Sequence, residues 1–379
     1  MSHFRLLFDA LASARLAIAV LTVLLALCIL GSALPQSSDP ASPEIRLWQE
    51  RHPWVAVVCA PLGGFDMYWS WSFLTTLAIF FVNLLACTIK RAMSQRRFAQ
   101  SPWSKDGSVY WGFLTIHTSL LLLILGAIVN QGFGGTGEFV VKENMGFWGG
   151  RQFGFFRDGF LLPARSEPPR LDFALFCKTL TPVYADQVGT KTDIAVEIVA
   201  AGGHRIPRVI GVNRPLSYGG YDFMVKEYGF APHIVLRETG GRTIAQQPAL
   251  MYPAEQPELG KENLFFAPPC KFKIELYPDA TAVDATALTV QNRSFLPHNP
   301  VFVFTLWEAE RLLGRALLRY DKTGLRPQFC QIGKYELGVA GLEYWCAFAA
   351  SRSPGLFFVY FSMWLCVAGF GLRYLRIFT

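Results

Sequence analysis

Residues 111–129 read WGFLTIHTSLLLLILGAIV. About 20 predominantly apolar residues are enough for a helix to cross the hydrocarbon core of a bilayer, and this stretch meets that length. It therefore predicts a membrane helix. The stretch nevertheless contains His117, whose ring nitrogens need a hydrogen-bond partner or another ligand. What satisfies this imidazole is the central question that the sequence raises.

Three further segments have the composition of membrane helices, at 16–34, 71–89 and 356–372. The last is near the lower length limit, but Pro354 can begin a helix there and Arg373 supplies a charged end. The first could also be a cleaved signal peptide, because small residues lie at its end. We expect a retained helix, because the leader before it is long and includes an acidic residue.

The composition agrees with a membrane protein that carries one large water-exposed domain. Of the 379 residues, 52% are hydrophobic and 17% are charged, whereas soluble chains are usually more polar. The excess of hydrophobic residues lies in the four segments. We therefore expect an integral membrane α plus β fold, with a large external antiparallel β-rich domain between the third and fourth transmembrane helices. The predicted domains are a membrane domain at 1–131, the external domain at 132–354, and the last helix with a short tail at 355–379.

The orientation in the membrane follows from the loop KRAMSQRRFAQSPWSKDG at 90–107. This loop has five basic residues against one acidic residue, and short loops rich in Lys and Arg stay in the cytoplasm. Both termini are then cytoplasmic, and the loop at 35–70 and the domain at 132–354 are external. Part of the net charge of +7 reflects this bias, so it does not indicate nucleic-acid binding.

The external domain shows the alternation of apolar and polar residues that is typical of half-buried strands. In DIAVEIVA at 193–200, for example, Ile194, Val196 and Ile198 fall on one face. Paired glycines predict a hairpin turn within 233–246. Similar runs occur at 221–228, 301–320 and 333–348. Short strands separated by Gly and Pro predict an antiparallel sandwich or barrel.

Several function classes lack their motifs. No two of the eight cysteines are three residues apart, so the chain has neither a C-x-x-C-H haem-attachment site nor a C-x-x-C redox motif. A phosphate-binding loop and an H-E-x-x-H zinc helix are also missing from the sequence. The external cysteines are irregularly spaced, and we expect most of them to be small buried hydrophobic residues. They are Cys59, Cys177, Cys270, Cys330 and Cys346.

His117 has two alternative explanations. It lies six residues after Trp111, which is about 9 Å along a helix, and its neighbours on that helix face carry no polar side chain. One alternative is a structural hydrogen bond with Asn83, which lies at a similar depth on the second helix. The other is a metal site, because a neutral imidazole is a good iron ligand and haem has a large apolar surface. The second axial ligand would then come from another chain, because the other three segments contain no histidine.

The other residues that could bind a cofactor are better explained by structural roles. Histidines in turn-like or strand-edge contexts are usually exposed structural residues, and we expect this of His52, His204, His233 and His298. A basic stretch after the third helix could meet lipid headgroups or haem propionates, but we expect a solvated face. It consists of Arg151, Arg157, Arg165 and Arg170.

Several motifs, in order along the chain, resemble the ResB family, also called CcsB, of cytochrome c biogenesis proteins. They are LASARLAIAVLTVLLALCILGSALPQ at 11–36, FDMYWSWSFLTTLAIFFVNLLACTIKR at 65–91, the His117 helix, IGVNRPLSYGGYDFMVKEYG at 210–229, and SRSPGLFFVYFSMWLCVAGFGL at 351–372. The sequence departs from the family pattern in a shorter external domain and in Arg214 within VNRPL.

The resemblance implies a function in the system II pathway of bacteria and chloroplasts. ResB proteins act with a second membrane protein, CcsA, in haem export and in the ligation of haem to apocytochrome c. The third-helix histidine of the family is an axial ligand of haem b within the membrane, which here is His117. The second histidine belongs to CcsA. The implied location is the bacterial inner membrane with a periplasmic β domain, and the implied role is that of a subunit of a haem-ligating complex, with no catalytic residue of its own.

Two other functions are open at this stage. A cofactor-free membrane scaffold would dock periplasmic partners through its external β domain. A cytochrome b subunit that oxidises quinol is less consistent with the sequence, because that class holds haem between pairs of histidines within its own helices and this chain has a single membrane histidine. Haem content of the purified protein distinguishes the scaffold from the haem-binding alternative.

Overall fold

The computed structural model describes residues 2–37, 42–96, 104–163, 165–185, 188–200, 203–211, 213–254, 263–284, 286–321 and 327–374. Four helices in these ranges are long and apolar enough to cross a membrane, which confirms the four predicted spans. They are α2 (Ala14–Ala33), α5 (Trp71–Ser94), α6 (Lys105–Phe133) and α7 (Leu356–Tyr374).

Serine caps fix where three of these helices begin. The Oγ atoms of Ser13, Ser70 and Ser104 each accept a hydrogen bond from a backbone N–H in the first turn of α2, α5 and α6. Helix α6 therefore begins six residues before the predicted residue 111, because a hydropathy window leaves out the polar first turns that a helix can extend into water. The shorter helices are α1 (Ser2–Leu11), α3 (Pro43–Arg51), α4 (Pro53–Cys59), η1 (Ala60–Leu62) and η2 (Gly64–Trp69).

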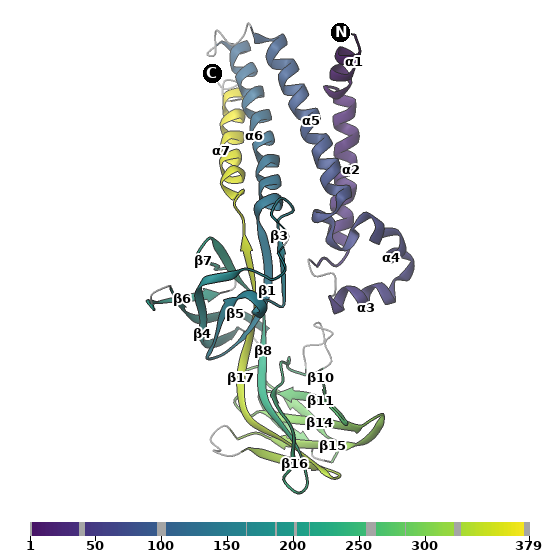
Figure 1. Cartoon of the computed structure of the whole chain (residues 1–379), viewed down its shortest axis with the longest axis vertical. Coiled ribbons are helices and arrows are strands. Elements are labelled where there is room, and N and C mark those ends of the chain that lie inside the picture. Colours follow the sequence, from purple (N-terminus) through teal and green to yellow (C-terminus); the bar gives the residue numbers. More distant parts are fainter. Residues whose placement is uncertain are drawn as a thin grey trace. The chain divides into compact units, whose positions relative to one another are not determined.

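The chain forms two compact units. Unit 1 consists of residues 1–135, 157–164 and 352–379, and unit 2 consists of residues 136–156 and 165–351. Within unit 1, α6 and α7 run side by side (Figure 1) and approach closely at small residues. A Cβ added to Gly369 of α7 would lie 2.9 Å from the backbone nitrogen of Ile116 on α6, so only glycine fits there.

Unit 2 is built of antiparallel strands in several sheets. One sheet has the order β3-β1-β17-β8-β7, with β16 beside β17 and β9 beside β8, and the others are β10-β11-β14-β15, β2-β4-β5-β6 and β12-β13. The bounds are β1 Gly135–Lys142, β2 Met145–Gly149, β3 Phe155–Asp158, β4 Arg170–Ala185, β5 Val188–Val199, β6 Arg205–Gly211, β7 Leu216–Tyr218, β8 Tyr221–Glu238, β9 Thr243–Pro248, β10 Leu264–Ala267, β11 Cys270–Tyr277, β12 Ala280–Asp284, β13 Thr289–Asn292, β14 Val301–Glu308, β15 Arg311–Arg319, β16 Gln328–Ile332 and β17 Tyr335–Arg352.

Strands β8 and β17 pair along almost their whole length and take part in two separate hydrophobic cores. Phe223 of β8 and Ala350 of β17 are partners in the core formed with β1, β4 and β5. Leu236 and Leu337 are partners in the core formed with β11 and β14. One long ribbon therefore joins two sandwich-like cores, and Figure 1 shows the two strands running side by side.

The strand predictions hold where alternation was clear. Ile194, Val196 and Ile198 are all buried on β5, as expected for one face of a half-buried strand. The paired glycines form the turn between β8 and β9, where Gly241 has a φ of +91° that favours glycine. The run at 301–320 is the β14–β15 hairpin. The fold class predicted from the sequence is thus confirmed.

Candidate functional site

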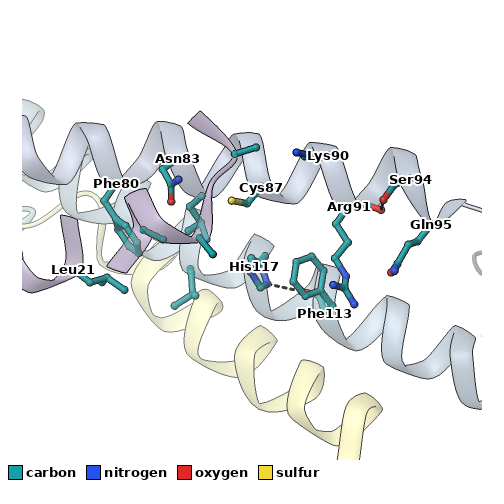
Figure 2. A pocket seen from close by; sticks show the side chains of 15 residues that line it. Leu21, Phe80, Asn83, Cys87, Lys90, Arg91, Ser94, Gln95, Phe113 and His117 are labelled. Carbon is teal, nitrogen blue, oxygen red and sulfur yellow. Dashed lines mark hydrogen bonds between the residues drawn. The ribbon is translucent and has the colours of Figure 1, made fainter. Parts of the chain in front are cut away.

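His117 lines a cavity between helices of unit 1. The cavity has a volume of about 560 Å³, which is within the usual range for small-molecule sites. Figure 2 shows apolar side chains around one end, near Leu21 and Phe80, and polar side chains at the other, near Lys90 and Gln95. The lining residues are Ala12, Ala14, Ala17, Leu21, Phe80, Asn83, Leu84, Cys87, Lys90, Arg91, Ser94, Gln95, Phe113, His117 and Leu120.

The imidazole of His117 is held by its own helix. Its Nδ1 atom lies 3.0 Å from the carbonyl oxygen of Phe113, and the two rings stack with centroids 3.7 Å apart at 32°. A carbonyl oxygen can only accept, so Nδ1 carries the proton in this bond and Nε2 carries the lone pair. The partner of Nδ1 is thus a backbone carbonyl of the same helix, whereas both alternatives from the sequence, Asn83 and a metal, lie outside that helix.

Asn83 has different partners from those expected. Its amide nitrogen donates to the carbonyl oxygen of Leu11 at 2.5 Å and to that of Ser13 at 3.1 Å. Leu11 is the last residue of α1, and the last carbonyls of a helix have no partner within that helix. The Ser13 carbonyl also accepts from the backbone N–H of Ala17 in the first turn of α2. Within the described ranges, no hydrogen bond joins Asn83 to His117. The structural alternative for His117 is therefore not the arrangement observed, although both side chains line the same cavity.

The polar end of the cavity contains two cations in different situations. Lys90 forms an ion pair with Asp9, with 2.7 Å between Nζ and Oδ1, and both side chains are about half exposed. The guanidinium of Arg91 lies over the ring of Phe113, 4.6 Å from its centroid. The Phe113 ring thus lies between Arg91 and His117, as Figure 2 shows. The Nε atom of Arg91 is buried and has no hydrogen-bond partner among the described residues.

The sequence pointed to Asn83 as a residue of α5 near His117, but it did not indicate that Cys87, Lys90 and Arg91 line the same cavity. Lys90 and Arg91 bore only on the orientation of the membrane helices. A signal was present: the lining residues of α5 recur at helical spacing, at 80, 83, 84, 87, 90, 91 and 94. The polar residues among them form a stripe on an otherwise apolar helix, but the sequence does not show which helix this stripe faces.

The other predicted histidines lie outside the cavity. His52 stands between α3 and α4, and His204 and His298 are exposed. His233 is half-buried on β8, and its Nε2 lies 3.0 Å from a carboxylate oxygen of Glu343. His52, His204 and His298 are thus exposed as expected, whereas His233 is partly buried beside Glu343.

The basic stretch after the third helix does not act as one surface. Arg151 is exposed and pairs with Glu167, as expected for a solvated residue. Arg157 instead pairs with Asp66 at 2.5 Å and lies over the ring of Trp69, within unit 1. The prediction of a solvated face is therefore wrong for Arg157, because η2 supplies it with a carboxylate and an aromatic surface.

The cysteines predicted to be buried are mostly so. Cys59, Cys177, Cys270 and Cys346 are buried free thiols, and Cys330 is partly buried. Burial raises the pKa of Cys177 to about 12, with a smaller contribution from the charge of Glu143. Burial also raises the pKa of Cys270, Cys330 and Cys346, so these thiols and that of Cys177 stay protonated near neutral pH and have little reactivity.

The donor set around His117 argues against a site for a bare metal ion. Among the described residues, no three His, Cys, Asp or Glu side chains come together as a metal site usually requires. A single imidazole in a large, mostly apolar cavity fits a cofactor that brings its own metal donors. In haem the porphyrin supplies four of the six ligands, and protein side chains supply axial positions.

Comparison with known proteins identifies the chain at the level of family. The model of the ResB-like family matches residues 14–107 and 104–376, which together include all four membrane helices and the whole β-rich unit. A search of curated proteins found no match.

Proposed function

This chain belongs to the ResB-like family, and we propose that it binds haem b within the membrane through His117 and helps deliver it to apocytochrome c. Family membership supports a role in cytochrome c biogenesis in general. The proposal adds the ligand, the residue that binds it and the direction of delivery. It also assigns the chain to a complex, because His117 would fill one axial position of the haem iron and the other would need a ligand from a second chain.

The observation that carries the proposal is the state of the His117 imidazole. Its Nδ1–H donates to the carbonyl of Phe113, which leaves the Nε2 lone pair for iron. Metal-binding histidines commonly donate their other ring nitrogen to a carbonyl or carboxylate, which fixes the tautomer and the ring orientation. Stacking on Phe113 restrains the ring further. The imidazole is thus prepared as a ligand before any cofactor binds.

The remaining lining residues suit the rest of the cofactor. Leu21, Phe80 and Leu120 offer apolar surface to a porphyrin, and the basic end of the cavity offers positive charge to its carboxylates. When bound, haem would be the group that is later attached to apocytochrome c. The chain itself would bind the cofactor, orient it and keep water away from it.

We infer the partner from the need for a second axial ligand, and the location from the charge of the loop at 90–107. The second axial ligand would come from a CcsA-type membrane protein, which also presents haem for attachment. The basic loop at 90–107 favours a cytoplasmic position for the basic end of the cavity and for both termini. The β-rich unit would then be periplasmic, on the inner membrane of a bacterial cell, where apocytochrome c is found.

A visible absorption spectrum of the purified chain with its CcsA-type partner tests the proposal most directly. We expect a haem Soret band that is lost in the His117→Ala variant and retained in a His233→Ala control. A wild-type complex that is fully folded, matures cytochrome and contains no haem would contradict the proposal and favour the cofactor-free scaffold.

A further inference from the structure

Arg91 carries a positive charge at the edge of the cavity, and it has no anionic partner among the described residues. It lines the same cavity as His117, its Nε is buried without a hydrogen bond, and its guanidinium covers the ring of Phe113. The neighbouring cation, Lys90, has Asp9 as a counter-ion. Within the described part of the chain, no carboxylate forms an ion pair with Arg91.

Two contacts stabilise the guanidinium of Arg91, but neither satisfies its buried Nε–H. Its position in the last turn of α5 lets it interact with the negative end of the helix dipole. The contact with Phe113 adds a cation–π attraction. A buried N–H of a charged side chain without a hydrogen-bond partner still costs free energy. A bound anion would satisfy both the charge and the N–H.

We infer that Arg91 binds a carboxylate of the ligand in this cavity, and thus orients a porphyrin with its propionate edge toward Arg91, Ser94 and Gln95. The inference rests on the proposed haem-binding function and adds the recognition of the porphyrin acid groups. The carboxylates of haem lie on one edge of the ring, so one anchored edge together with one ligated iron fixes the orientation of the cofactor.

The chemistry of arginine suits this role better than that of the neighbouring lysine. The central carbon of the guanidinium lies 4.6 Å from the centre of the Phe113 ring. The N–H groups of a guanidinium lie in one plane, where they can form two parallel hydrogen bonds to one carboxylate. Lys90 is already paired. Phe113 connects the two functions, since its carbonyl oxygen holds His117 and its ring supports Arg91.

The test compares a porphyrin diacid with its ester. The purified full-length chain, in phosphatidylcholine nanodiscs, is titrated with metal-free protoporphyrin IX and with its dimethyl ester, and dissociation constants are measured by fluorescence. Metal-free porphyrin does not depend on ligation by His117. We expect Arg91→Gln to weaken binding of the diacid by roughly tenfold to a hundredfold, the effect of losing a charge-assisted hydrogen bond. Binding of the ester should be unchanged, which also shows that the variant is folded.

Two further variants make the result specific. Arg91→Lys keeps the charge without the planar fork and should recover part of the lost affinity. Arg373→Gln removes a charge on α7 that acts on His117 but does not line the cavity, so it should leave diacid binding unchanged. An equal loss in Arg373→Gln, an unchanged diacid affinity in Arg91→Gln, or a wild-type chain that binds neither porphyrin would each overturn the inference.

Other outcomes separate this inference from the proposed function and from a lipid. If His117→Ala lowers the affinity for ferric haem and Arg91→Gln leaves the diacid unaffected, haem ligation stands and the carboxylate site is wrong. If Arg91→Gln acts on the diacid while His117→Ala leaves ferric haem unaffected, the carboxylate site stands and the ligation is wrong. An Arg91 effect that occurs only in nanodiscs with phosphatidylglycerol, and equally for both porphyrins, assigns the guanidinium to a lipid phosphate and overturns the inference.

Discussion

The Nδ1 atom of His117 lies 3.0 Å from the carbonyl oxygen of Phe113, one helical turn earlier on α6. This bond answers how an imidazole is accommodated in a membrane helix. One nitrogen is satisfied by the backbone of the same helix, and the other forms no hydrogen bond within the described part of the chain. Binding a ligand requires a lone pair on that second nitrogen, whereas a purely structural role does not.

If the proposed function is right, replacing His117 by Ala should remove haem from the complex of the chain with the proposed CcsA-type partner and stop cytochrome maturation. Added imidazole is small enough to enter the space left by the side chain and should partly restore both. Haem content is measured by absorbance, and maturation by covalent haem in the cytochrome. Full haem content in His117→Ala would show that the histidine is structural.

Replacing Asn83 by Leu should loosen the packing of α1 and α2 on α5 and leave haem content nearly unchanged. The amide of Asn83 bonds two backbone carbonyls, and hydrogen bonds of this kind within membranes contribute about 0.6 kcal/mol each on average. We therefore expect a loss of stability on the order of 1 kcal/mol, measured by thermal unfolding in detergent. Thr88→Val is the matched control, because Thr88 bonds only within its own helix. A loss of haem in Asn83→Leu with normal stability would contradict this expectation.

The orientation in the membrane can be tested with reporter fusions. A fusion at Gln95, at the end of α5, should report the cytoplasm, and a fusion at Gly203, in the turn between β5 and β6, should report the periplasm. The physical reason is the excess of Lys and Arg in the loop that follows α5. A cytoplasmic signal from Gly203 would invalidate the charge argument and the location of the β-rich unit.

Single replacements by Ser of the cysteines in the β-rich unit should not abolish cytochrome maturation under oxidising conditions. Cys177, Cys270 and Cys346 are buried free thiols, and Cys330 is a partly buried one. A buried serine hydroxyl costs about 1–3 kcal/mol when it lacks a partner, so we expect lower stability and retained function. Complete loss of maturation at normal protein levels in any one variant would indicate a disulfide or a redox role instead.

The thiol of Cys177 should make the stability of the chain pH-dependent in alkali. Burial raises its pKa from 9.0 to about 12, so above pH 9 the unfolded state loses this proton while the folded state keeps it. The free energy of unfolding then falls as the pH rises from 9.0 toward about 12. Thermal unfolding should show a steeper alkaline decline for the wild type than for Cys177→Ala. Equal slopes would show that Cys177 is not protonated in the core as described.

The sequence by itself determined the elements that depend on consecutive residues. Hydropathy over about 20 residues located α2, α5, α6 and α7, because crossing a bilayer is a property of each segment alone. Alternation located β5 for the same reason, since burial of one face requires every second residue to be apolar. The family resemblance likewise followed from motifs within single segments, and the family match confirms it.

Tertiary structure decided which of these elements share a site. The sequence shows that His117 and Arg91 are polar residues in or beside membrane helices, but only helix packing brings them to one cavity with Phe113 between them. The sequence also shows that the Asn83 amide needs a hydrogen-bond partner. That this partner is the Leu11 carbonyl and not His117 depends on where α1 ends beside α5. In the β-rich unit, the join of two cores through β8 and β17 follows from pairing between residues more than one hundred positions apart, for example Phe223 and Ala350. Local sequence patterns show how polar each position is. Contacts between distant segments depend on how those segments pack together, which cannot be read from any one segment.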